Sequence, residues 1–289
     1  MIFLLGSIVL TSWLTLSFKL VERFRLSSFQ TIVFNYIFCV LTGSIVNGQA
    51  PAYVANIRLD WFPWACIMGC VFIALFNIIA FTAQRIGVAV TSVANKLSLV
   101  IPFIFSIYFY NEPATWLKIV GIILALFAVV LTCLPANHEN KVKAPRWLYI
   151  LPVLLFAGSG LLDTMIKYVE HKFLKAENKN EYLITAFSMA AILGIVILIF
   201  QLAIGKQKFS GKAVLAGAAI GIPNYFSIWC LMEVLKKYAN NSSAIIPINN
   251  VGIVLFSSVM AWLVFKEKLS LINWIGIGLA VGAIALIAS

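Results

Sequence analysis

The stretch VAVTSVANKLSLVIPFIFSIYFYNEPATWLKIVG, residues 88–121, decides the fold. It holds an apolar segment of about 20 residues, the turn Asn111-Glu112-Pro113, and the start of a second apolar segment that runs to about Leu134. A helix of about 20 apolar residues crosses the ~30 Å hydrocarbon core of a bilayer. Pro113 suits the first helical position, where no backbone hydrogen bond is lost, and the charge of Glu112 suits the positive end of the second helix. The stretch therefore predicts a hairpin of two membrane-spanning helices.

The same hairpin occurs again as SAIIPINNVGIVLFSSVMAWLVFKEKLSLINWIG, residues 243–276. A constant shift of 155 residues relates the matching residues, which are Ala89 and Ala244, Asn95 and Asn250, Glu112 and Glu267, Gly121 and Gly276. Upstream, residues 18–22 (FKLVE) resemble residues 166–170 (IKYVE). Similarity at a fixed period indicates an internal repeat. We expect two halves, residues 1–134 and 147–289, joined by a polar linker over 135–146.

The composition places the chain in a membrane. Of its 289 residues, 62% are hydrophobic and 11% are charged, whereas soluble domains carry about 25% charge. The net charge of +11 does not indicate nucleic-acid binding, because the basic residues are scattered over short links rather than gathered on one face. The sequence has no P-loop, no HExxH, no Ser/His/Asp arrangement and no cluster of metal-ligating residues, so we expect no enzyme, cofactor or metal site.

The apolar runs predict an all-α membrane protein with ten transmembrane helices. The expected spans are 2–20, 30–48, 61–85, 88–110, 114–134, 147–168, 182–204, 212–236, 243–265 and 271–288. Because each half has five spans, the second half must enter the membrane from the side opposite to the first. Inverted repeats of this kind are typical of secondary transporters, whose substrate site lies near the midplane between the halves.

Polar side chains inside apolar spans are the candidate site residues, because each is costly in hydrocarbon. Lys96 lies about two turns inside the fourth span, with Asn95 beside it. Asp163 lies well inside the sixth span. It pairs either with Lys167, four residues further along the same helix, or with Lys96, a cationic substrate group or a proton. We expect Lys96 to face either a wet cavity or a carboxylate.

A second group of candidates lies on the third, eighth and ninth spans. These residues are Asn77, Asn224, Tyr225, Trp229 and Asn250. Tyr225 and Trp229 share one stripe of a helix, which indicates either ordinary packing or an aromatic pocket wall. The repeated Glu112 and Glu267 lie in tight turns at helix starts, where the helix dipole and capping explain them.

At this point the chain resembles the drug/metabolite transporter superfamily, and most of all its EamA-like members with ten helices. The resemblance rests on two Glu-bearing turns, each followed by a tryptophan and a glycine. Their residues are Asn111-Glu112-Pro113-Ala114-Thr115-Trp116 with Gly121, and Lys266-Glu267-Lys268 with Trp274-Ile275-Gly276. It implies a secondary carrier that works by alternating access, with its cavity between the halves. It also implies both termini in the cytoplasm, whereas the basic residues of the links favour termini outside. The resemblance adds weight to the candidates on cavity-lining helices, which are Lys96, Asn95, Asp163, Asn224, Tyr225, Trp229 and Asn250.

The residues and the resemblance together predict an exporter or exchanger of a small polar metabolite in the cell (inner) membrane. An amino-acid-like zwitterion fits best, with Lys96 meeting a carboxylate and Asp163 an ammonium group or a proton. Protons or another ion would drive transport, lipids would surround the protein, and the chain would act as a monomer or a homodimer. The alternatives are a non-transporting membrane scaffold or assembly protein, a transporter of hydrophobic drugs or nucleotide-sugar-like compounds, a passive channel, and an intramembrane enzyme.

Overall fold

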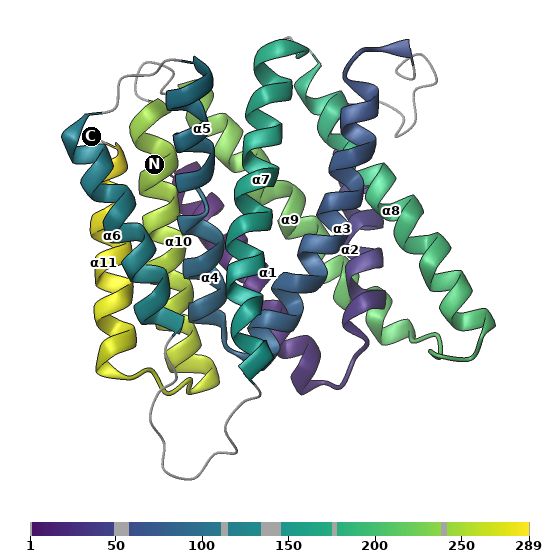
Figure 1. Ribbon diagram of the computed structural model, residues 1–289. Coiled ribbons are helices and arrows are strands. Elements are labelled where there is room, and N and C mark those ends of the chain that lie inside the picture. The colour runs from purple at the N-terminus through teal and green to yellow at the C-terminus, as the bar shows by residue number, and fades with distance from the viewer. Residues whose placement is uncertain are drawn as a thin grey trace.

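The computed structural model describes residues 2–48, 58–110, 115–133, 146–174, 178–237 and 242–288. Over these residues the chain is helical and contains no strand (Figure 1). The helices are α1 (Ile2–Arg23), α2 (Ser28–Asn47), α3 (Phe62–Arg85), α4 (Val88–Leu97), α5 (Val100–Tyr110), α6 (Trp116–Cys133), the short 3-10 helix η2 (Arg146–Tyr149), α7 (Ile150–Lys172), α8 (Lys179–Ala203), α9 (Gly211–Lys237), α10 (Ser242–Phe265) and α11 (Leu271–Ala288).

Helix length and hydropathy confirm a multi-pass membrane protein. Within the described ranges, eight helical segments are long and apolar enough to cross a bilayer, and α4 with the first part of α5 counts as one of them. The segments Trp116–Thr132 and Leu271–Leu286 are apolar but shorter. The helices alternate in direction, so that α1 descends and α7 ascends in Figure 1. Accordingly α1, α3 and α10 end at the lower end of the bundle, where α2, α4 and α11 begin.

One expected span differs from the structure. We expected a single helix over 88–110, but the helix is interrupted at Ser98 and Leu99. Pro102 has no N–H to donate to the Ser98 carbonyl four residues earlier, and its ring crowds that carbonyl. The Ser98 oxygen instead accepts from the Ile101 N–H at 2.9 Å, a tighter turn that separates α4 from α5.

Helices from the two ends of the sequence interlock. The pairs with the most extensive packing are α6 with α11, α2 with α9, α1 with α9, and α3 with α8. Small residues permit close approach, as is usual for helix packing in membranes. A Cβ on Gly69 of α3 would lie 2.7 Å from the Ala186 carbonyl oxygen of α8, and a Cβ on Gly217 of α9 would lie 3.0 Å from the Asn35 amide nitrogen of α2.

The larger buried cluster lies among α1, α2, α3 and α8. Tyr36 is fully buried there and stacks with Phe72 at 6.3 Å, and Phe72 stacks with Phe187 at 5.4 Å. A second cluster, around Leu97 and Val254, joins α4 and α10 to α6 and α11. Because α4 packs against this second cluster, its position fixes where Lys96 lies.

Candidate functional site

The interruption between α4 and α5 places Lys96 beside a helix end within the fourth span. Lys96 is the last residue but one of α4, and its side chain is half-buried. Asn95 next to it uses its backbone carbonyl to accept a 2.6 Å hydrogen bond from the Ser98 hydroxyl. A helix end inside a membrane protein leaves backbone groups that other helices or a ligand must satisfy. The cation is therefore next to polar backbone as well as to side chains.

Lys96 of α4 and Asp163 of α7 lie close enough for their charges to interact. Among the described residues, Lys19 and Glu22 form an ion pair at 3.8 Å, whereas no ion pair within 4.0 Å joins Lys96 to Asp163. The side chain of Asp163 is exposed at the surface of the bundle. The two charges are thus neighbours without direct contact. The alternative partner, Lys167, has a side chain that lies outside the described residues.

Helix α10 brings further polar groups close to α4. Helix α10 packs against α4, and its Asn249 and Asn250 are buried. Among the described residues, the Asn249 side-chain oxygen and the Ser92 hydroxyl are buried without a hydrogen-bond partner. Buried polar atoms are normally paired. Ser92 precedes Lys96 by one helical turn, so the two share a face of α4.

The candidates on α9 lie elsewhere. The Asn224 amide donates a 3.1 Å hydrogen bond to the Asn35 side-chain oxygen of α2, and the Tyr225 hydroxyl accepts one from the Asn47 amide at 3.3 Å. The ring of Trp229 meets the Phe3 ring edge to face at 5.5 Å. These residues join α9 to α2 and α1, and none of their contacts given by the described residues reaches α4 or α7.

Asn77 on α3 is satisfied within its own helix, because its amide donates a 2.7 Å hydrogen bond to the Ile73 carbonyl. The position of Asn77 therefore does not connect it to Lys96. The structure brings together Lys96, Asn95 and Asp163, with Asn250 on an adjacent helix. The other candidates lie at different positions in the helix bundle. They are Asn77, Asn224, Tyr225 and Trp229.

Glu267 caps a helix, but not the helix that begins after its own turn. Its carboxylate accepts hydrogen bonds from the Val88 N–H at 2.9 and 3.1 Å and from the Ala89 N–H at 3.4 Å, at the start of α4. Glu267 thus has the capping role that we expect at a helix start, but the helix it caps is α4, whereas Ser270 and Asn273 cap α11. The Ser270 hydroxyl accepts from the Asn273 N–H at 3.2 Å, and the Asn273 side chain accepts from the Ser270 N–H at 2.9 Å. Glu112 lies outside the described residues.

Burial raises the pKa of Glu267, while the N–H groups of Val88 and Ala89 and the charge of Lys19 counteract the increase. Gly87, directly before α4, leaves room for this contact, and its φ of +139° suits glycine. A Cβ at Gly87 would lie 2.9 Å from a Glu267 carboxylate oxygen.

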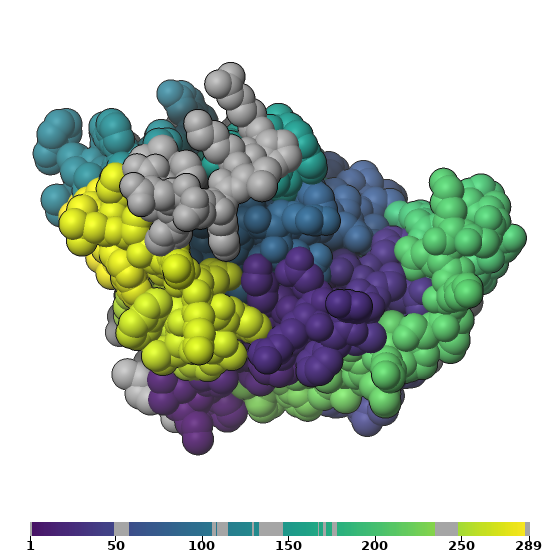
Figure 2. Space-filling view, turned by 90° about the horizontal axis from the view of Figure 1, so that it is seen from below, coloured from purple at the N-terminus to yellow at the C-terminus, as the bar shows by residue number. Residues whose placement is uncertain are grey.

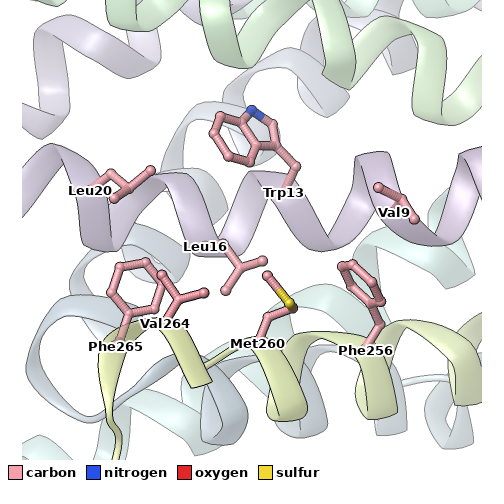
Figure 3. Close-up of a pocket in the computed structure, with 8 residues that line it drawn as sticks. All are labelled: Val9, Trp13, Leu16, Leu20, Phe256, Met260, Val264 and Phe265. Carbon is pink, nitrogen blue, oxygen red and sulfur yellow. The ribbon is translucent and has the colours of Figure 1, made fainter. Parts of the chain in front are cut away.

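An apolar cavity of about 230 Å³ lies between α1 and α10, away from the charged pair. Leu16 of α1 and Met260 of α10 point toward one another in it (Figure 3). The residues that line the cavity are Val9, Trp13, Leu16, Leu20, Phe256, Met260, Val264 and Phe265. Because this lining is apolar, the cavity can bind an apolar ligand but offers no partner to a charged group.

Comparison with known proteins gives a family and a fold. Residues 146–289 match the EamA-like transporter family. An uncharacterized protein of Haemophilus influenzae is 24% identical to this chain over 262 residues, which cover 88% of this chain and 86% of that protein. A solved crystal structure matches with a TM-score of 0.65 and 16% identity, and the match covers 99% of this chain and 94% of the other. At that identity the likeness concerns the fold alone.

Proposed function

Because the chain belongs, through its second half, to the EamA-like transporter family, we propose that it is a secondary transporter of a small polar metabolite. It works by alternating access, as an exporter or an exchanger, in the cell (inner) membrane. An amino-acid-like zwitterion is the substrate class that the charged pair fits best. The observation that carries this proposal is the pair of Lys96 and Asp163, which interact across α4 and α7 without direct contact.

The proposed architecture is ten spans in two inverted halves, with α4 and α5 forming the fourth span. The opposite directions of α1 and α7 support it (Figure 1). The contacts between helices support it as well. Exchanging the halves replaces α1 by α7, α2 by α8, α3 by α9, α4 with α5 by α10, and α6 by α11. The contact α2–α9 then becomes α8–α3, α1–α10 becomes α7–α4 and α7–α5, and α10–α11 becomes α4–α6, and the structure contains both members of each set. The pairs α6–α11, α2–α8 and α4–α10 convert into themselves. The division into 1–134, a linker at 135–146, and 147–289 follows from the same symmetry.

The chemistry of the site is that of two opposite charges held apart in an apolar bundle. A zwitterion supplies both complementary charges, so its carboxylate binds the Lys96 ammonium and its ammonium binds the Asp163 carboxylate. In the absence of substrate the two protein charges stabilise one another, which limits the cost of an unpaired charge in the membrane. A proton on Asp163 would weaken its hold on the ammonium group, which gives a route for coupling to a proton gradient.

A thermal-shift screen of the purified protein in detergent tests the proposal. The probes are amino acids, organic acids, sugars and nucleotides. A ligand at a hundred times its Kd stabilises the folded state by about 2.7 kcal/mol. We expect an amino acid to raise the Tm of the wild type and to leave Lys96→Ala and Asp163→Asn unshifted. The matched control is Lys206→Ala, an exposed lysine in the α8–α9 link, which should keep the full response. A zwitterion response that survives Lys96→Ala would contradict the proposed site.

The apolar cavity between α1 and α10 favours a second candidate, a transporter of hydrophobic compounds. On this alternative, filling the cavity by Met260→Trp would abolish the response to an apolar probe such as a lipophilic amine, and Lys96→Ala would not. The charged-pair proposal predicts the reverse pattern, so the two variants together separate the candidates.

A further inference from the structure

The lower end of the bundle carries polar contacts between the halves. Figure 2, which looks onto this end, shows the yellow segment of α10 and α11 beside the purple segment of α1. Here the Glu267 carboxylate, in the α10–α11 corner, accepts hydrogen bonds from the first two N–H groups of α4. A carboxylate at the positive end of a helix gains both hydrogen bonds and a favourable interaction with the helix dipole. One side chain thereby ties the second half of the chain to the fourth span of the first half.

Hydrogen bonds from α1 hold the corner between α3 and α4, next to the N–H groups that Glu267 binds. The Lys19 ammonium of α1 donates to the Ala83 and Gln84 carbonyls at the end of α3, at 3.2 and 3.0 Å. The Gln84 side chain donates back to the Phe18 carbonyl at 2.9 Å. The corner between α3 and α4 is therefore fixed to α1, and Lys19 also interacts electrostatically with Glu267.

Helix α4 is built as a separate short element. It has ten residues, it is held at its start by Glu267, and the break at Ser98 and Leu99 separates it from α5. Lys96 lies near its far end. Because α4 is short, has a break at one end and is held by Glu267 at the other, it can rotate about the break once Glu267 lets go.

We propose that Glu267 and the start of α4 form a latch that keeps the lower end of the transporter closed, and that releasing Glu267 opens this end toward the Lys96 site. Glu267 is a positioning residue on this proposal, because it acts on Lys96 through α4. The inference rests on the proposed function, since only a protein that alternates between two open states has an end to unlatch.

Accessibility of a cysteine on α4 tests the latch. All five native cysteines are first replaced by serine or alanine, and Ser92→Cys is introduced as a reporter. Ser92 is buried one turn inside the clamped start of α4, so a closed latch protects it. A membrane-impermeant maleimide is then applied to right-side-out and to inside-out vesicles, which samples the reporter from each side separately. The readout is the ratio of the two labelling rates, for which no substrate needs to be known.

We expect Glu267→Gln to raise labelling from the latch side and to lower it from the other side, changing the ratio about tenfold. Gly87→Ala should change the ratio in the same direction, because its Cβ would collide with the carboxylate. Lys268→Gln is the matched control, an exposed charged residue in the same α10–α11 corner, and should leave the ratio unchanged. If Glu267→Gln fails to fold, Glu267→Asp, whose shorter side chain reaches less far, replaces it.

The outcomes separate the latch from the transporter. Wild-type labelling from both sides together with an unchanged ratio in Glu267→Gln would overturn the latch and leave alternating access intact. An equal rise from both sides would also overturn it, because that is the result of general loosening. Wild-type labelling from one side only, under all conditions, would instead overturn the proposed function on which the latch rests.

Discussion

The charged pair between α4 and α7 makes a quantitative prediction for a double-mutant cycle of Lys96→Met and Asp163→Asn. Both substitutions keep the approximate size of the side chain and remove its charge. The two charges lie farther apart than 4.0 Å among the described contacts. Two unit charges at 4 Å interact by about 4 kcal/mol at an effective dielectric constant of 20, so the pair is worth less than this. Because the separation of the charges and the exposure of Asp163 both weaken the interaction, we expect a coupling energy of about 1–2 kcal/mol.

The single variants should each be less stable than the double variant, because each leaves one charge without its partner. A lysine in the middle of a membrane helix costs at least ~2.5 kcal/mol when unpaired. The assay is reversible unfolding in mixed dodecylmaltoside and SDS micelles, followed by tryptophan fluorescence. The control cycle pairs Asp163→Asn with Lys206→Met in the α8–α9 link and should be additive.

Additivity of Lys96→Met and Asp163→Asn within about 0.3 kcal/mol would refute the reasoning, because distant independent sites behave in that way. It would mean that the two groups do not sense one another, and that a zwitterion has no reason to bridge them.

Three further predictions follow from the structure. Burial raises the pKa of Glu267 above its value in the unfolded chain, so the folded state binds the proton more tightly. The stability of the protein should therefore fall as the pH rises from the unfolded pKa through the folded pKa. Measurement of Tm against pH should show this decrease in the wild type and not in Glu267→Gln. Pro102→Ala should join α4 to α5 by restoring the hydrogen bond to Ser98, raising the Tm while slowing transport; an unchanged transport rate would show that the joint is not used. Gly69→Val should lower unfolding stability by about 2 kcal/mol or more, because its side chain meets the α8 backbone; unaltered unfolding in mixed micelles would show that α3 and α8 are not so close.

The positions of most helices could be predicted from the sequence, because apolar runs in a membrane protein are long and are separated by polar turns. Phe62–Arg85 and Leu271–Ala288 lie within a residue of the expected spans. The break after Leu97 could have been predicted from Pro102 and the missing donor it implies. The continuous hydropathy nevertheless predicts a single span through it, because hydropathy does not register a lost hydrogen bond.

The candidate site could be predicted only in part. Lys96 and Asp163 stand out because a charge inside an apolar run is rare, and the structure places them together. Asn224 also lies inside an apolar run, but it is bonded to Asn35 on α2, and a sequence does not say which helix an amide meets. Tyr225 likewise contacts Asn47 rather than the charged pair.

The partner of Glu267 was beyond sequence reasoning for a related reason. Val88 lies 179 residues away in the chain, and local rules assign a carboxylate in a turn to the helix that follows it. Only the interlocking of the halves brings the α10–α11 corner to the start of α4.

The central claim is that the Lys96 and Asp163 pair binds a zwitterion during transport. Counterflow in proteoliposomes tests it most directly: vesicles are loaded with an unlabelled mixture of amino acids, and uptake of each labelled amino acid is measured at trace concentration. We expect the wild type and Lys206→Ala to accumulate at least one amino acid above equilibrium, and Lys96→Ala and Asp163→Asn not to do so. Accumulation that persists in both site variants, or its absence for every amino acid with folded wild-type protein, would contradict the account.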